Sequence, residues 1–202
     1  MEKSFRRGSY DKMEERAIET LKKMLSIRGV KVETPETLTP LDDTRMYNFG
    51  GVLVIFSEKS RISDSNLTSY IKFAESNGFT NGTIVVSQIP SSETIVNIVR
   101  EYINNPNNQL LQIFDIRRLQ FDITTHVKVP KHRILKQSEV SLLEKKFNIL
   151  NPKKELPWID SQDALAKWIG ARPSDIIEVI RFSESSGATP YYRYCVANVL
   201  DT

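Results

Sequence analysis

Short runs of apolar residues alternate with amphipathic stretches over the first 122 residues. The runs at 51–56, 83–87 and 110–115 are apolar almost throughout, which is typical of strands buried on both faces of a sheet. Residues 65–76, and a stretch from Ser91 or Ser92 to about Ile103, carry apolar side chains at helical spacing. The order strand, helix, strand, helix, strand predicts an α/β layer, a small sheet with helices covering both faces.

Two further helix signals precede this alternation. Residues 11–28 are amphipathic, and Gly29 follows as a natural stop. One face of this predicted helix carries Met13, Ala17, Leu21, Leu25 and Arg28. Thr39-Pro40, followed by Asp42-Asp43, predicts a second helix start, since a Thr cap, a first-turn Pro and early acids all favour one.

The pattern changes after residue 122, so we predict two domains, 1–122 and 123–202. A helix is expected from Ser138 to about Phe147, then a polar connection, then a helix from Ser161 to Gly170. Two strands, 176–181 and 191–196, are joined by a predicted loop at 183–190 that contains Gly187. These features predict a compact α+β unit.

Composition narrows the function only slightly. The net charge is +3, acids and bases balance over residues 1–122, and so nucleic-acid binding driven by charge alone is not expected. The single cysteine, Cys195, rules out an internal disulfide and is predicted to be a buried thiol. Neither a membrane-length apolar run nor a secretory signal is recognisable, so we predict an intracellular protein without membrane contact.

Catalytic or metal-binding patterns are weak. His126 and His132 are six residues apart, and no cysteine or acidic cluster completes a zinc site. The Gly50-Gly51 pair is predicted to be a turn, because no Gly-Lys-Ser/Thr follows it. Glu58-Lys59 follows the first strand, where nucleases place metal-binding groups. A degenerate nuclease would need Glu58 and Asp42 or Asp43 to converge on a metal ion. Trp158 and Trp168 are expected to be core side chains.

Two spaced motifs in the second domain are more specific. The first has the form Ile-Thr-x-His-x-x-Val-Pro-x-His and comprises Ile123, Thr124, His126, Val129, Pro130 and His132. The second, Arg-x-Ser-Glu-x-Ser-Gly followed by Tyr-Arg, comprises Arg181, Ser183, Glu184, Ser186, Gly187, Tyr192 and Arg193. Together with the run Leu-Pro-Trp-Ile-Asp at 156–160, they resemble the assembly domain of the fifth subunit shared by nuclear RNA polymerases I, II and III. The archaeal counterpart in this family consists of the assembly domain alone.

The resemblance is strong over residues 120–197 and weak before them, where the order of elements is similar to that of the eukaryotic jaw domain. It implies a non-catalytic subunit, without metal or cofactor, of a DNA-directed RNA polymerase. The assembly domain would dock on the largest subunit and near small subunits, and the jaw domain would lie near downstream DNA. The implied interface residues are Val129, Pro130, His132, Arg181, Ser183, Glu184, Ser186, Gly187, Tyr192 and Arg193.

Departures from the family pattern add two expectations. Ser174 replaces a glycine of the family, which predicts a strained residue if that position has a positive φ. The divergence suggests a subunit encoded by a large DNA virus, located in a cytoplasmic viral factory and in virions, whereas a cellular subunit would be nuclear.

The alternative to a polymerase subunit is a stand-alone nucleic-acid-binding module. Read without the family, Arg181, Glu184 and Arg193 would pair with one another or with a partner near the hairpin loop, or the hairpin would simply stabilise itself.

Overall fold

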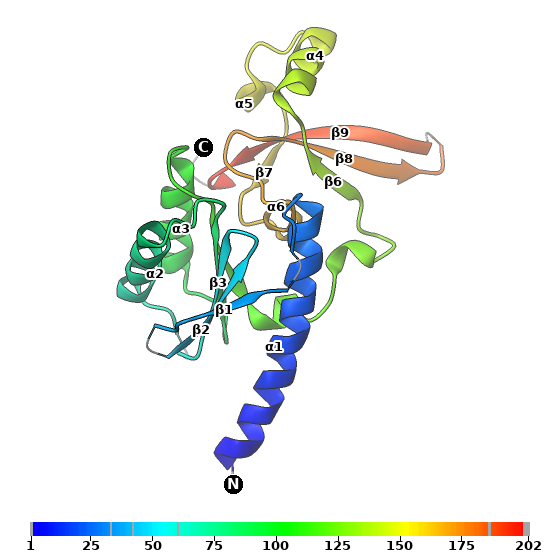
Figure 1. Ribbon diagram of the computed structural model, residues 1–202. Coiled ribbons are helices and arrows are strands. Elements are labelled where there is room, and N and C mark those ends of the chain that lie inside the picture. Colours follow the sequence, from blue (N-terminus) through cyan, green and yellow to red (C-terminus); the bar gives the residue numbers. More distant parts are fainter. Residues whose placement is uncertain (1, 33, 42, 60, 186, 200–202) are drawn as a thin grey trace. The chain divides into compact units, whose positions relative to one another are not determined.

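The chain folds as two compact units, Met1–Asp122 and Ile123–Thr202, each with its own sheet and core. The computed structural model describes residues 2–32, 34–41, 43–59, 61–185 and 187–199 (Figure 1). Both units combine helices with a sheet, so the predicted fold classes, α/β and then α+β, are confirmed.

The sheet of the first unit has five strands in sequence order. They are β1 (Glu36–Leu38), β2 (Thr44–Phe49), β3 (Val52–Ser57), β4 (Thr83–Ser87) and β5 (Leu111–Asp115). The first three run antiparallel, whereas β3, β4 and β5 are parallel. The predicted apolar runs became β3, β4 and β5, and β1 and β2 were not predicted.

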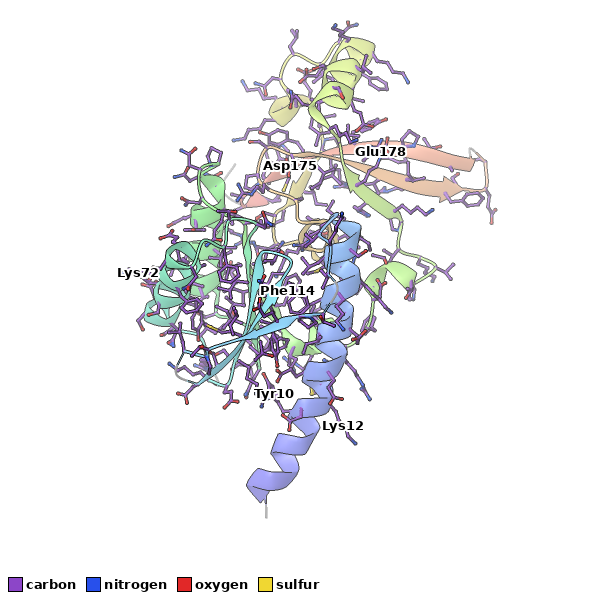
Figure 2. The ribbon with its side chains drawn as sticks, in the orientation of Figure 1. Tyr10, Lys12, Lys72, Phe114, Asp175 and Glu178 are labelled. Carbon is purple, nitrogen blue, oxygen red and sulfur yellow. The ribbon has the colours of Figure 1, made fainter. Side chains whose placement is uncertain are left out.

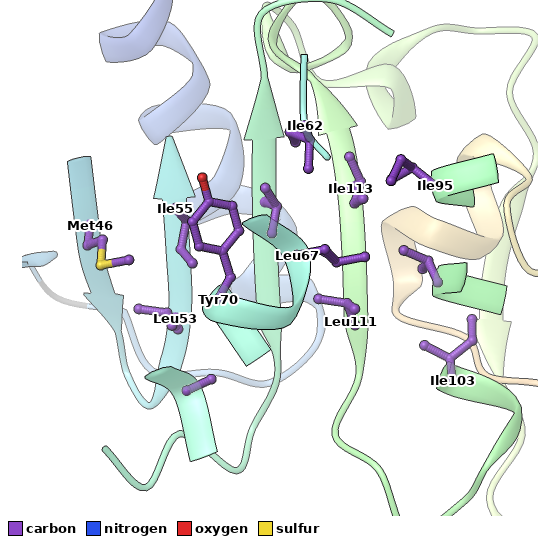
Figure 3. Packing of buried hydrophobic residues seen from close by; sticks show 13 residues of the cluster. Met46, Leu53, Ile55, Ile62, Leu67, Tyr70, Ile95, Ile103, Leu111 and Ile113 are labelled. Atoms are coloured by element: carbon purple, nitrogen blue, oxygen red, sulfur yellow. The ribbon is translucent and has the colours of Figure 1, made fainter. Parts of the chain in front are cut away.

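Helices cover both faces of this sheet, as predicted (Figure 1). On one face, α2 (Asp64–Ser76) and α3 (Glu93–Asn104) pack against β3, β4 and β5 through the hydrophobic cluster of Figure 3. On the other lies α1 (Glu2–Ile27), and the short turn η1 (Ile116–Leu119) contacts it. Burial on both faces explains why β3 and β4 are apolar at nearly every position.

The predicted helix start at 39–43 is wrong. This segment is the turn between β1 and β2, which pair antiparallel with Leu38 opposite Met46. Thr44 donates both its backbone N–H and its hydroxyl to the carbonyl of Leu41. Asp43 has a φ of 55°, which suits a tight turn, and Asp42 lies outside the described residues. Turns and helix starts use the same residue types, and here the strand pairing decided between them.

The second unit has a four-stranded sheet in the order β6-β8-β9-β7. Its strands are β6 (Lys131–Ile134), β7 (Trp158–Asp160), β8 (Ile176–Ser183) and β9 (Gly187–Val196). The predicted loop at 183–190 is wrong, because Ser183 belongs to β8 and residues 187–190 belong to β9. Pro190 fits within the strand because it lies opposite Ile180 at a position where the nitrogen faces away from β8.

Three helices flank this sheet. One face packs against α4 (Gln137–Phe147), which α5 (Pro152–Glu155) follows, and the other packs against α6 (Ala164–Ile169). The helices are confirmed, but their predicted caps are wrong. The carboxylate of Asp163 accepts from two backbone N–H groups of α6, whereas Ser161 is buried and donates to Ala197. Lys136, not Ser138, precedes α4.

Candidate subunit interface

The outer half of the β8–β9 hairpin has no strand beside it among the described residues. The pairing of β6 with β8 reaches only Ile180, and β7 pairs with β9 only from Tyr194 onward. The two long strands nevertheless stay paired as far as Ser183 and Gly187. The outer hairpin is therefore a two-stranded arm, and such a ribbon is only marginally stable by itself in water.

Register divides this arm into two chemically different faces. One face, here called the apolar hairpin face, carries Ile180, Phe182, Ala188 and Pro190. Phe182 is 80% exposed. The opposite face carries Arg181, Ser183, Thr189 and Tyr191, and the Arg181 guanidinium lies 5.1 Å from the centre of the Tyr191 ring. Neither Phe182 nor Tyr191 was among the residues predicted from sequence, although strict alternation along the strand could have grouped Phe182 with Ile180.

The turn of the hairpin is held by its own serines. The hydroxyl of Ser183 lies 3.0 Å from that of Ser185 and accepts from the Ser185 N–H. Gly187 has a φ of 65°, so glycine supplies the turn conformation expected there. Ser186 lies outside the described residues. Glu184 is exposed at the turn.

The expected ion pairs among Arg181, Glu184 and Arg193 are not found within the described chain. Arg181 stacks on Tyr191, and the salt bridges of the described residues involve none of the three. Arg193 is far along the strand from the turn, opposite Ile177, and donates to the carbonyl of Trp158 at 2.9 Å. Its role inside the unit is to join β9 to β7.

An ionic cluster marks the base of the arm. Arg133 on β6 binds Glu178 at 2.6 Å and Glu139 at 2.8 Å, and Glu178 is labelled in Figure 2. A backbone bond from Lys136 and the bonds with Arg133 lower the pKa of Glu139. The Tyr192 hydroxyl donates to Glu178, and burial, followed by the charge of Glu178, raises the pKa of Tyr192. Tyr192 thus belongs to this cluster on the face occupied by α4.

Val129 and Pro130 precede β6, and His132 lies within it. Val129 lies in a bend and donates to the carbonyl of His126 at 2.9 Å. The imidazole Nδ1 of His132 lies 2.8 Å from the carbonyl of Pro130. β6 is an edge strand of its sheet, so its outer side presents backbone groups that could pair with another chain.

Several charged and polar side chains of the first unit form a network around Arg45. Its guanidinium contacts Asp11, Glu14 and Glu58 at 3.0, 2.8 and 3.2 Å. The Glu14 side chain is only 4% exposed and also accepts from the Tyr47 hydroxyl. Burial raises the pKa of Glu14 in spite of the Arg45 charge.

Two tyrosines complete this network. Burial and the charge of Glu14 raise the pKa values of Tyr10 and Tyr47 to about 12, and Tyr10 is labelled in Figure 2. Glu58, considered above as a nuclease residue, is here a partner of Arg45. Within the described part of the chain, which leaves out Asp42, no three His, Cys, Asp or Glu side chains gather closely enough to hold a metal ion.

Other expectations concern the core of the second unit. Cys195 is fully buried, and burial raises the pKa of its thiol to about 12. Trp168 is buried, whereas Trp158 is half-buried and donates its indole N–H to Lys153. Ser174 has a φ of 81°, which confirms the predicted left-handed position.

No helix in the described part of the chain is long and apolar enough to cross a membrane.

Comparisons with known proteins cover part of the chain, and the family model places its match on the second unit. The family model described as RNA polymerase Rpb5, C-terminal domain, matches residues 121–195. The DNA-directed RNA polymerase subunit Rpo5 of Sulfolobus acidocaldarius is 43% identical over 77 residues, which are 38% of this chain and 89% of that protein. The Rpo5 proteins of Pyrococcus abyssi and Archaeoglobus fulgidus are 43% and 38% identical, over 92% and 100% of their lengths and 38% and 39% of this chain.

The residues that the family model matches, 121–195, contain both motifs and the whole described arm. The archaeal relatives are covered over 89–100% of their lengths at 38–43% identity. On this basis, the chain belongs to the family of RNA polymerase Rpb5 and its archaeal counterpart Rpo5.

Proposed function

We propose that this chain is a non-catalytic subunit of a DNA-directed RNA polymerase and that its second unit docks on the largest subunit. One observation carries the proposal: the family model matches residues 121–195, which include most of the second unit. Matches of 77 and 78 residues of this chain also cover 89% and 100% of archaeal subunits named for that enzyme. A module that is an entire subunit in those relatives is suited to the same role here.

The docking surface consists of the β8–β9 arm and of β6, which pairs with the inner part of β8 at the edge of the sheet. Phe182 is exposed next to Ile180 and Pro190. A partner that covered it would stabilise the complex by about 25 cal/mol per Å² of apolar surface removed from water. Arg181, Glu184 and the serines at the tip supply polar contacts around it. Val129, Pro130 and His132 contribute at the edge of the sheet.

The first unit lies near downstream duplex DNA in this proposal. Its acids and bases balance, so the assembled enzyme, rather than the charge of this unit, brings the DNA close. The neighbouring small subunits are further partners, and no metal or cofactor is required. The location follows the enzyme, in the nucleus for a cellular polymerase and in the cytoplasmic factory and virion for a viral one.

Co-purification tests the proposal. The full chain carries a tag in its source cells or virions, and the captured complex is quantified by mass spectrometry. We expect stoichiometric recovery of the two largest polymerase subunits. Phe182→Asp should reduce that recovery tenfold or more, because a charge would have to be buried in the interface. The double variant Arg181→Glu with Glu184→Arg should reduce it less.

The matched control is Val127→Asp, since Val127 is 100% exposed but lies outside the arm. This variant should co-purify like the wild type. If wild-type protein recovers neither large subunit, the proposed function is wrong. If Phe182→Asp recovers them as well as the wild type does, the subunit assignment stands and the arm is not the docking surface.

A further inference from the structure

The helix α4, the turn after it and the short helix α5 present a second exposed surface, made of residues outside the arm. On α4, Val140 and Leu143 pack into the core. Leu142 points outward and is 68% exposed. Lys145 and Lys146 follow Leu142 by three and four residues, so they flank it on the same side of the helix. Leu150, in the turn before α5, is 93% exposed.

Lysines dominate the charge of this region. Lys145 and Lys146 end α4, Lys153 and Lys154 lie in α5, and all four are exposed. We call these four lysines together with Leu142 and Leu150 the lysine–leucine surface. The salt bridges of the described chain involve none of the four.

Nearby acids neutralise these lysines only in part, because the four lysines exceed Glu144 and Glu155 by two. Glu139 is held by Arg133 and by the backbone N–H of Lys136. Glu155 accepts from the backbone N–H groups of Leu150 and Asn151, which fixes the turn between the helices. Glu144 is two residues from Leu142, and residues two apart on a helix do not face each other. The surface is therefore positive around two exposed leucines.

We infer that the lysine–leucine surface binds an acidic protein segment that carries apolar side chains at helical spacing. The lysines attract carboxylates. The leucines contribute to binding only when apolar side chains of a partner cover them and remove them from water. Duplex DNA would satisfy the lysines but leave Leu142 and Leu150 against phosphates or water, so a protein partner fits better. This inference does not rest on docking to the polymerase, because it uses none of the residues of the arm.

The test measures peptide binding to the full chain by fluorescence anisotropy at physiological salt. The probe is a labelled synthetic peptide of Glu and Asp with Leu and Phe at positions i, i+3, i+4 and i+7. A second peptide keeps every acid and replaces Leu and Phe with Ser. A duplex DNA of random sequence is the third probe. We expect the first peptide to bind at least tenfold more tightly than the other two.

Variants assign that binding to the surface. The double variant Leu142→Ser with Leu150→Ser should weaken the binding of the first peptide roughly tenfold or more, because two apolar contacts are lost. Lys145→Glu with Lys146→Glu should weaken it similarly. The matched control, Lys12→Glu with Lys72→Glu, makes the same charge change at exposed lysines of the first unit and should leave binding unchanged, as should Phe182→Asp.

Several outcomes would overturn the inference. Equal binding of both peptides, or binding indifferent to the leucine variant, would mean attraction by charge alone. Tighter binding of the duplex would make the surface a nucleic-acid contact. A complete lack of peptide binding would refute it directly. Circular dichroism of each variant verifies that these exposed substitutions leave the fold intact.

Discussion

The sheets of the two units differ in how completely they are covered. In the first unit, β3 and β4 are buried at every position, with helices against both faces. In the second, helices cover only the inner part of the sheet, and β8 and β9 continue into an exposed arm that carries Phe182. A sheet covered on both faces uses its apolar surface to stabilise its own fold. A sheet left bare keeps apolar surface for a partner.

The ionic clusters of the two units differ in the same direction. Arg45 is 31% exposed and its partner Glu14 only 4%, whereas Arg133 is 51% exposed. Removing one member of a buried pair leaves an uncompensated charge, but exposed pairs are screened by water and contribute little. Salt bridges therefore contribute more to the stability of the first unit than to that of the second. The second unit differs from the first by its exposed apolar side chains.

Matched phenylalanine truncations provide the most severe test of this comparison. Phe56 is fully buried in β3 and makes an edge contact with Tyr47, with ring centres 5.8 Å apart. Phe56→Ala should lower the free energy of unfolding by about 3–5 kcal/mol. Phe182→Ala should change it by no more than about 0.5 kcal/mol, because little burial is lost.

Urea denaturation followed by far-ultraviolet circular dichroism measures both changes. Tryptophan fluorescence serves as a separate readout of the second unit, because the only two tryptophans, Trp158 and Trp168, lie there. A loss of stability in Phe182→Ala comparable to that in Phe56→Ala would mean that the arm is part of a folded core, contrary to the comparison.

Arg45→Ala should have the next largest effect. We expect a cost of about 2–3 kcal/mol at neutral pH, less than for a fully buried pair because Arg45 is partly exposed. Burial raises the pKa of Glu14, so the folded state holds this proton to a higher pH than the unfolded state does. The free energy of unfolding therefore falls as pH rises through the raised pKa.

Loss of Arg45 removes a cation that lowers this pKa, so the fall should become larger and extend to higher pH. The measurement is a series of urea midpoints from acidic to neutral pH for wild type and variant. Lys22→Ala is the control, since its pair with Glu19 is exposed and should contribute no more than about 0.5 kcal/mol. A cost for Arg45→Ala that is independent of pH would show that Glu14 is not the group responsible.

Sequence patterns predicted the parts of the fold whose burial is uniform. β3, β4 and β5 were recognisable because a strand buried on both faces is apolar throughout. β2 was missed because the segment Thr44–Phe49 mixes polar and apolar residues, a pattern shared with turns. The extension of β9 through Pro190 was also missed, because local propensity does not show that the nitrogen of Pro190 faces away from its partner strand.

The candidate interface was predicted less completely than the fold. The motifs identified residues such as Arg181 and Gly187, but whether a helix covers a strand depends on contacts distant in sequence. For this reason the exposure of Phe182 could not be read from its neighbours. Arg193 shows the reverse error, because this residue of the second motif was expected near the hairpin loop but donates to the carbonyl of Trp158 instead.

Ser174 provides the smallest test, and it concerns the backbone of the second unit. Its φ of 81° is costly for a residue with a Cβ, by roughly 1–2 kcal/mol. Glycine removes that strain but adds about 0.5–1 kcal/mol of unfolded-state entropy. The hydroxyl of Ser174 accepts from Tyr194 at 3.1 Å in an exposed position, where the bond contributes little. Ser174→Gly should therefore stabilise the second unit by about 0.5 kcal/mol.

Thermal denaturation followed by tryptophan fluorescence would detect this as a slightly higher Tm. Ser174→Ala is the informative control, because it loses the same hydrogen bond yet keeps the Cβ and hence the strain, so its Tm should not rise. If the glycine and alanine variants melt together, the left-handed backbone at this position carries no strain. The difference between them isolates the backbone term from the hydroxyl.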